Sequence, residues 1–191
     1  MLVKDHKELD KDGLWLVRLV IPAKNYTQCF AKMGYKIIKK SFDFHKVDYM
    51  KYTIKQAKCL KLDLERIGRR ETIEMDKDLI VKLDIEAMYP SITYELVAEA
   101  VRYYAEGFSE EETARVEAGL DMLKFSMSNC LINFREKYLQ YGKERDPLKR
   151  VLTIGGYDSA WLADLTACYI LERAEPVWSE QFAYFKIYRD D

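Results

Sequence analysis

Apolar residues recur along this chain with two spacings, one typical of helices and one typical of short strands. Across residues 25–40 the apolar positions follow a helical period, with lysines between them: Phe30, Met33, Ile37 and Ile38. This pattern predicts an amphipathic helix. Asp43 then offers an N-cap for a second helix that runs toward Arg70.

Helical patterns continue in the second half of the chain, each with a start or stop signal. The pattern over residues 93–107 predicts a helix, and Gly107 supplies the stop. Ser109, followed by glutamates up to Glu112, forms a capping box that opens a helix to about Asn129. A further helix is expected to run to about Ser179, with Leu165, Tyr169 and Val177 toward the core.

Short apolar and aromatic runs between these segments predict strands. They cover residues 13–23, 81–84, 130–141, 148–154 and 182–188. A loop containing Gly142 and Asp146-Pro147 is expected to join the third and fourth runs into a hairpin. The sequence therefore alternates helices with short strands.

Two of these strands end in carboxylates. Val81–Asp84 ends in Asp84, and the run 182–188 leads to Asp190 and Asp191. If the two strands lie side by side, the carboxylates meet at one rim of a sheet, where they repel unless one is neutralised or a cation lies between them. Hard oxygen ligands favour Mg²⁺, and a pair of such ions suits in-line phosphoryl transfer.

These two stretches carry a family resemblance. The segment D-I-E-A-M-Y-P-S-I, beginning at Asp84, resembles motif A of right-hand template-dependent polymerases, and Y-R-D-D, beginning at Tyr188, resembles motif C of reverse transcriptases. The segment K-x-S-F-D-F before residue 45 resembles a stretch that precedes motif A in Penelope-like elements. The resemblance implies an RNA-directed DNA polymerase that transfers nucleotides onto a primer 3′-hydroxyl.

The resemblance also implies roles for particular residues. Asp84, Asp190 and Asp191 take the catalytic positions, and with Ile85 they form the metal site for two Mg²⁺ ions, with Mn²⁺ as an alternative. Tyr89, five residues after Asp84, falls on the aromatic gate beneath the sugar of the incoming nucleotide. From the residues alone, Tyr89 could equally be a core aromatic, and the paired aspartates a solvated chain end.

Other nucleotide contacts follow from weaker matches. Arg18 resembles a basic residue near the triphosphate, and it could also be an exposed hairpin arginine. Gly156 and Ser159 belong to a glycine-rich loop in the place of motif B, although Asp158 and Ala160 stand where relatives have glycine and proline. A plain strand-to-helix turn, with Asp158 as its N-cap, is the alternative.

Charge separates along the chain. Residues 1–70 hold 17 Lys and Arg against 8 Asp and Glu, a net +9, which leaves 14 against 24, a net −10, for residues 71–191. A basic part beside an acidic one suits a phosphate-binding region next to a carboxylate metal site, and solvated helix faces would also produce it. Arg66, Arg69 and Arg70 are the candidate nucleic-acid contacts, although arginines also commonly close helices.

Together these features predict an α+β fold: the fingers and partial palm of a right-hand polymerase, with helices packed on a small antiparallel sheet. Residues 1–78 would form a basic, fingers-like lobe, and residues 79–191 a partial palm with motifs A, B and C. The return strand and thumb of the family would be missing, so this chain alone should be inactive or barely active.

The expected partners are an RNA or DNA template–primer and deoxynucleoside triphosphates, with no membrane. Four dispersed cysteines and a charged first segment predict an intracellular protein with reduced thiols, while the oligomeric state stays open. Two alternatives remain: a catalytically inactive remnant that binds nucleic acid, and a family B-like DNA polymerase palm, which shares motif A but expects a different motif C.

Overall fold

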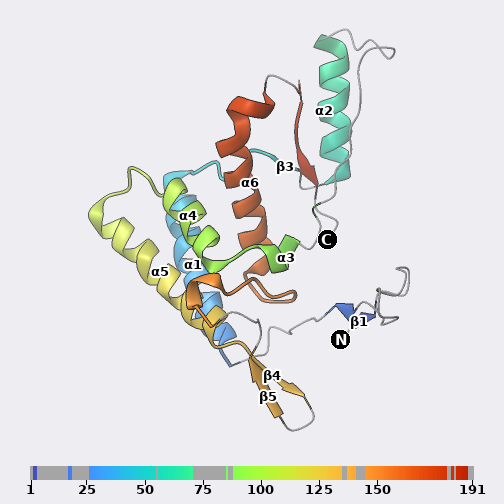
Figure 1. Ribbon diagram of the computed structural model, residues 1–191. Coiled ribbons are helices and arrows are strands. Elements are labelled where there is room, and N and C mark those ends of the chain that lie inside the picture. Colours follow the sequence, from blue (N-terminus) through green and yellow to red (C-terminus); the bar gives the residue numbers. More distant parts are fainter. Residues whose placement is uncertain are drawn as a thin grey trace. The chain divides into compact units, whose positions relative to one another are not determined.

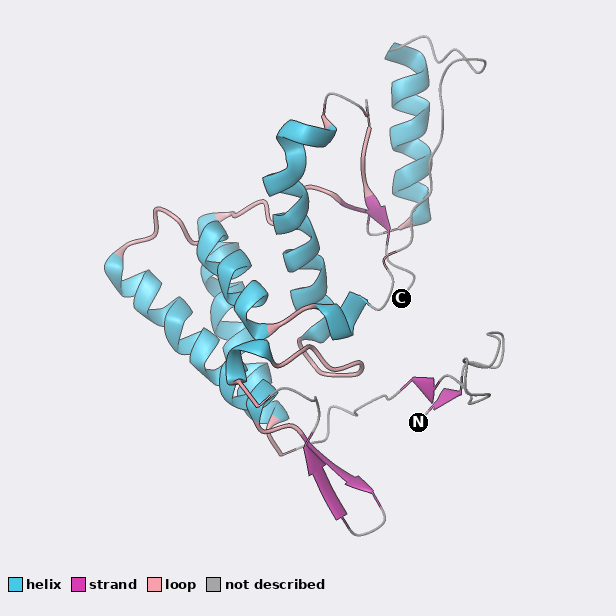
Figure 2. Ribbon diagram, viewed as in Figure 1, coloured by secondary structure: helices cyan, strands magenta, loops and turns pink. Residues whose placement is uncertain are grey.

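The computed structural model describes residues 2–3, 17–18, 26–54, 56–70, 85, 88–134, 137–140, 145–179, 182 and 184–188. Helices dominate these residues (Figures 1 and 2). The α-helices are α1 (Gln28–His45), α2 (Ala57–Arg70), α3 (Met88–Ser91), α4 (Tyr94–Tyr104), α5 (Glu110–Ser128) and α6 (Ser159–Trp178), with a 3₁₀ turn, η1 (Pro147–Lys149). None of these helices is long and apolar enough to cross a membrane.

The strands are two to four residues long and occur as separate pairs. They are β1 (Leu2–Val3), β2 (Val17–Arg18), β3 (Thr53–Ile54), β4 (Leu131–Phe134), β5 (Lys137–Gln140) and β6 (Ile187–Tyr188). The pairs β1–β2 and β4–β5 are antiparallel, and β3–β6 is parallel. The predicted α+β fold with helices on an antiparallel sheet is therefore wrong for the described residues, which form a mainly helical structure.

Local chemistry explains why runs 130–141 and 148–154 do not form the predicted hairpin within the described residues. Run 130–141 folds back on itself as the hairpin β4–β5 and does not pair with run 148–154. At the start of run 148–154, the 3₁₀ turn η1 begins at Pro147. The Asp146 carboxylate accepts a hydrogen bond from the Leu148 N–H at 2.9 Å. Within run 148–154, Val151 makes an isolated bridge to Thr93.

The chain divides into two compact units. Unit 1 comprises residues 1–47 and 87–166, and unit 2 comprises residues 48–86 and 167–191. Both units are assembled from segments distant in sequence, and α6 contributes its first part to unit 1 and its second part to unit 2. The predicted functional division at residue 78 stays a prediction.

In unit 1, α1 and α5 pack closely because each carries a glycine at their contact. A Cβ added at Gly34 would lie 2.5 Å from the carbonyl oxygen of Gly119, and one added at Gly119 would lie 2.8 Å from the Ile38 side chain. No larger residue fits at either position without separating the helices. The close approach lets Ile38 and Leu120 bury their side chains fully.

An aromatic cluster completes the core of unit 1. Phe42, with 0% of its surface exposed, lies with its ring 6.1 to 6.3 Å from the rings of Tyr104, Phe108 and Trp161. Burying a phenylalanine contributes about 2 to 3 kcal/mol. Phe42 thus joins α1, α4 and α6 through one side chain.

Several helix boundaries match their predicted signals. The start of α4 had no predicted signal: the Thr93 hydroxyl accepts a hydrogen bond from the Leu96 N–H, so α4 has its own N-cap and does not continue from the preceding segment. The Ser109 hydroxyl accepts from the Glu112 N–H at 3.3 Å, which confirms the predicted start of α5. Gly107, with φ of +87°, lies just beyond α4 as its stop signal required.

The predicted N-cap at Asp43 is wrong. Asp43 lies in the last turns of α1, where its carboxylate is 2.6 Å from the Lys39 ammonium. The helix continues because Ser41 and Phe42 are buried in the core of unit 1, and it ends at Lys46, which adopts a left-handed conformation with φ of 53°. The second helix, α2, begins only at Ala57.

Unit 2 contains α2, the second part of α6 and the parallel pair β3–β6, in which Thr53 is opposite Ile187 and Ile54 opposite Tyr188. Aromatic contacts hold these elements: the ring of Trp178 lies 5.6 Å from Tyr52 and 5.3 Å from Phe185. Val177, predicted to face the core, is 69% exposed, whereas Leu165, in unit 1, is buried as expected.

Candidate functional site

The three predicted catalytic aspartates, Asp84, Asp190 and Asp191, lie outside the described residues, so their meeting at a metal site stays a prediction. Their neighbours are partly described. Ile85 is 52% exposed, and β6, which leads toward Asp190, pairs with β3. Among the residues that the structure does describe, no three His, Cys, Asp or Glu side chains are placed to hold a metal ion.

Tyr89 lies half-buried in the short helix α3. Its carbonyl oxygen accepts a hydrogen bond from the Ile92 N–H at 3.3 Å. Directly after it, the Tyr94 N–H donates to the Arg150 carbonyl at 2.7 Å, and the Leu152 N–H donates to the Ile92 carbonyl at 3.0 Å. These two bonds fix the segment after Tyr89 against the segment that leads into the glycine-rich turn.

The glycine-rich turn precedes α6, and its geometry requires glycine. Gly155 has φ of +94°, in the region that side chains disfavour. A Cβ at Gly156 would collide with the Ser159 hydroxyl and lie 2.9 Å from the Thr153 hydroxyl. Ser159 and Thr153 are buried, so the turn closes around two hydroxyl groups at the start of the helix.

Asp158 immediately precedes α6 and buries its carboxyl group almost completely, with 4% of the residue exposed. Burial removes water from the carboxylate and raises the pKa of Asp158 to about 6, against the opposing effect of a hydrogen bond from its own backbone. Its carbonyl accepts from the Leu162 N–H at 3.0 Å, which begins the helix. Asp158 therefore places a buried carboxyl group with a raised pKa inside the turn.

The turn is anchored to α1 by contacts that sequence reasoning missed. The Tyr157 N–H donates to the side-chain carbonyl of Gln28 at 3.0 Å. The Tyr157 ring meets the ring of Tyr35 edge-on at 5.7 Å, and the Lys32 ammonium lies 5.2 Å from its centre. Gln28 lies 129 residues away in sequence, and no local pattern marks it, although an aromatic residue inside a glycine-rich loop could have drawn attention to Tyr157.

The basic candidates are only partly described. The backbone of Arg18 lies in β2 opposite Leu2, and its side chain is outside the described part. Arg66 is exposed on α2 with its guanidinium 3.7 Å from the Asp63 carboxylate. Arg69 and Arg70 end α2, again without a described side chain. The structure thus brings together the segments of Tyr89, Gly156 and Ser159 in unit 1, while Arg66 belongs to unit 2.

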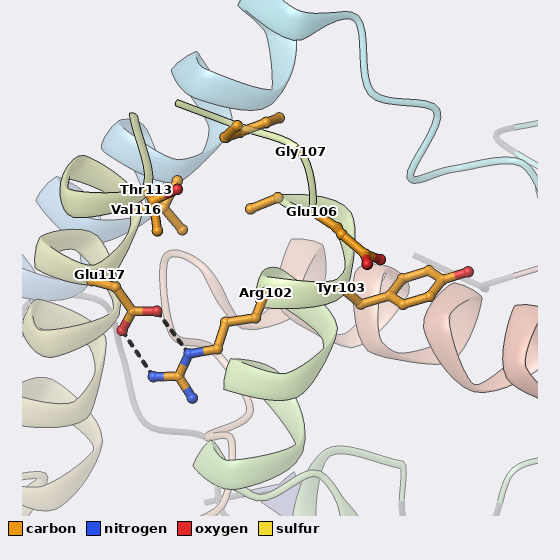
Figure 3. A pocket seen from close by; sticks show the side chains of 9 residues that line it. Arg102, Tyr103, Glu106, Gly107, Thr113, Val116 and Glu117 are labelled. Atoms are coloured by element: carbon orange, nitrogen blue, oxygen red, sulfur yellow. Dashed lines mark hydrogen bonds and ion pairs between the residues drawn. The ribbon is translucent and has the colours of Figure 1, made fainter. Parts of the chain in front are cut away.

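A separate hollow of about 450 Å³ lies between the end of α4 and the start of α5 (Figure 3). Arg102 and Glu117 face each other across it and form two hydrogen bonds of 2.7 and 2.8 Å. These bonds lower the pKa of Glu117 and raise that of Arg102. Because Glu117 already neutralises Arg102, the hollow offers little to an anionic ligand, and it contains none of the predicted site residues.

Comparison of this chain with protein-family models, with curated proteins and with solved structures gives no match. The functional evidence therefore rests on the motifs and on the geometry of unit 1.

Proposed function

We propose that this chain carries the motifs of an RNA-directed DNA polymerase, with motif A at Asp84 and motif C at Asp190 and Asp191. One observation supports the proposal beyond the motifs themselves. The two hydrogen bonds between residues 92–94 and 150–152 join the segment after Tyr89 to the segment before Gly155. This proximity supports the proposal, because the end of motif A and the loop in the place of motif B should contact the same nucleotide. The antiparallel palm sheet is no part of this proposal.

The donor set of the proposed metal site fits Mg²⁺ or Mn²⁺, since Asp84, Asp190, Asp191 and the backbone carbonyl of Ile85 offer hard oxygen ligands. Two bound ions would stabilise the attacking and leaving oxygens of an in-line displacement. In this reaction the primer 3′-oxygen bonds to the α-phosphorus of a deoxynucleoside triphosphate, and pyrophosphate leaves. Tyr89 would lie beneath the sugar, and Arg18 near the triphosphate.

In the proposed site, the glycine-rich turn would be the segment whose backbone lies closest to the nucleotide. Gly155 and Gly156 leave the backbone bare at the start of α6, and a helix start favours negatively charged groups. Ser159 turns its hydroxyl inward, so its role would be to hold the turn's shape, while exposed Tyr157 offers a ring at the surface.

Equilibrium binding of deoxythymidine triphosphate tests the proposal, measured by calorimetry with a primed RNA template and with or without Mg²⁺. We expect Mg²⁺-dependent binding that weakens at least tenfold, about 1.4 kcal/mol, in Asp84→Asn and in Asp190→Asn. Asp48→Asn, at an exposed position, is the matched control and should bind as the unmodified chain does. Binding that depends neither on Mg²⁺ nor on the substitutions at Asp84 and Asp190 would refute the metal site.

The same assay tests whether Tyr89 selects deoxyribonucleotides over ribonucleotides. A bulky ring beneath the sugar excludes the ribose 2′-hydroxyl, the group that distinguishes the two sugars. Tyr89→Ala should therefore raise the affinity for ribonucleotides relative to deoxyribonucleotides. If Tyr89 is only a half-buried packing residue, both affinities should fall together and their ratio should stay constant.

A further inference from the structure

The exposed face of α1 carries a row of lysines. Lys32, Lys36 and Lys40 are exposed and follow one another at intervals of four residues. Four residues of helix span about 6 Å, so the three ammonium groups form a line along one side of α1. The opposite side is buried, with Gly34, Ile38 and Phe42 in the core.

Unlike several basic residues on the described helices, these lysines form no ion pair with a described acidic residue. Lys39 pairs with Asp43, Lys61 with Glu65, Arg66 with Asp63, Arg102 with Glu117, and Arg115 with Glu111 and Glu112. Lys36 and Lys40 make no ion pair with any described residue, and the Lys32 ammonium lies over the Tyr157 ring. Like charges four residues apart repel and destabilise a helix, a cost that a bound polyanion would remove.

Apolar and aromatic side chains flank the lysine row. Phe44, 75% exposed, lies one helical turn beyond Lys40, and Met33, 51% exposed, lies beside Lys36. Tyr157 is exposed next to Lys32. A line of cations with exposed rings at both ends suits a chain of phosphates carrying planar bases, because the cations follow the backbone and the rings stack on bases.

An anionic membrane is a poorer match for this surface. A helix that lies in a membrane interface needs a free apolar face to insert, whereas the apolar face of α1 is occupied by the core of unit 1 through Ile38 and Phe42.

We propose that the exposed face of α1 binds single-stranded nucleic acid, with Lys32, Lys36 and Lys40 on successive phosphates and Phe44 stacking on a base. The inference deepens the proposed function by assigning a surface to its nucleic-acid partner. It needs neither the metal site nor a nucleotide.

Binding of a fluorescent 20-nucleotide single strand, measured by anisotropy from 50 to 200 mM salt without Mg²⁺, tests the surface. Each phosphate contact on a single strand contributes about 0.7 to the slope of log affinity against log salt. The triple variant Lys32→Gln, Lys36→Gln, Lys40→Gln should therefore lose about 2 from that slope. A control triple, Lys58→Gln, Lys137→Gln, Lys149→Gln, changes the net charge equally at exposed positions and should lose much less.

Phe44→Ala should weaken binding by about 5- to 100-fold with the salt slope unchanged, because stacking carries no charge. The triple α1 variant should melt at the same temperature as the unmodified chain or higher, since it removes repulsion from an exposed face. Lys36→Ala alone, with an expected slope change of about 0.7, covers the case in which the triple variant fails to fold.

Equal loss of slope in both triple variants would overturn the inference, because net charge alone would then account for binding. Binding to phosphatidylserine vesicles with no binding to the oligonucleotide would also overturn it. The strand assay contains neither Mg²⁺ nor a nucleotide, so failure of the metal site and failure of this surface give different results.

Discussion

The contacts within unit 1 differ in kind from the contacts within unit 2. In unit 1, α1, α4, α5 and the start of α6 bury whole apolar side chains, including Ile38, Phe42, Leu120 and Leu162. In the described part of unit 2, Tyr52 is buried but the rings of Trp178 and Phe185 are half-exposed. Polar contacts also join its segments, such as Lys51 with Glu175 at 3.2 Å and the Tyr184 hydroxyl with Asp63 at 3.0 Å.

This difference has a physical consequence. Burial of apolar side chains contributes to the free energy of unfolding in proportion to the buried area and hardly depends on salt. Exposed ion pairs and hydrogen bonds contribute about 1 kcal/mol or less each. Unit 1 should therefore supply most of the stability of the chain. It also contains Tyr89 and the glycine-rich turn, so these proposed nucleotide contacts rest on the better-packed part.

The largest expected effect is at the centre of unit 1. Phe42→Ala removes a fully buried ring that contacts Tyr104, Phe108 and Trp161, and should cost about 3 to 5 kcal/mol in unfolding free energy. The matched change in unit 2 is Phe185→Ala, at a half-buried ring beside Trp178, and should cost about half as much. Urea unfolding followed by circular dichroism measures both, and equal losses would contradict the comparison.

A smaller effect should appear in the pH dependence of unit 1. The folded-state pKa of Asp158 is raised above its unfolded value of about 3.8, to about 6. The protonated carboxyl therefore stabilises the fold below about pH 4, and this contribution is lost as the pH rises through 6. Asp158→Asn stays neutral, so its stability relative to the unmodified chain should increase from pH 4 to pH 7 by roughly 2 to 3 kcal/mol.

Chemical denaturation at several pH values measures this difference, and Asp48→Asn supplies the control. Asp48 is exposed, so its substitution should change the stability of the chain little. A difference for Asp158→Asn that is flat with pH would mean that its carboxyl group is not desolvated.

Local signals in the sequence predicted the boundaries that local chemistry controls. Ser109 and Gly107 mark the start of α5 and the end of α4 because a hydroxyl cap and a left-handed glycine act within one turn. Asp43 gave an equally good local signal and was overridden, since burial of Phe42 continues α1 past it.

Features that depend on tertiary contacts could not be predicted. The helical period of α1 was correct, but Phe30 and Met33, taken for its apolar face, are exposed, and the buried face includes Gly34, whose importance depends on Gly119 of α5. In the candidate site, the glycine-rich turn follows from its sequence, whereas the bond from Tyr157 to Gln28 joins residues with no local relation. The metal site formed by Asp84, Asp190 and Asp191 stays a prediction.

The smallest expected effect concerns a single hydrogen bond in unit 2. The Tyr184 hydroxyl donates to the Asp63 carboxylate, which also lies 3.7 Å from the Arg66 guanidinium. Burial and the neighbouring carboxylate raise the pKa of Tyr184, so the hydroxyl stays protonated and able to donate throughout the neutral range. Tyr184→Phe keeps the ring and should cost about 1 kcal/mol in unfolding free energy.

A double-mutant cycle with Asp63→Asn separates that hydrogen bond from the rest of the unit. If the contact stabilises unit 2, the two substitutions should be coupled by up to about 1 kcal/mol, because Tyr184→Phe removes the donor and Asp63→Asn removes the charge of the acceptor. Tyr157→Phe is the control in unit 1: its exposed hydroxyl makes no hydrogen bond to a described residue, so the change should be neutral. Additive effects of Tyr184→Phe and Asp63→Asn would show that unit 2 depends on its aromatic rings, Trp178, Tyr52 and Phe185, more than on its polar contacts, and that the two units differ only in how deeply their rings are buried.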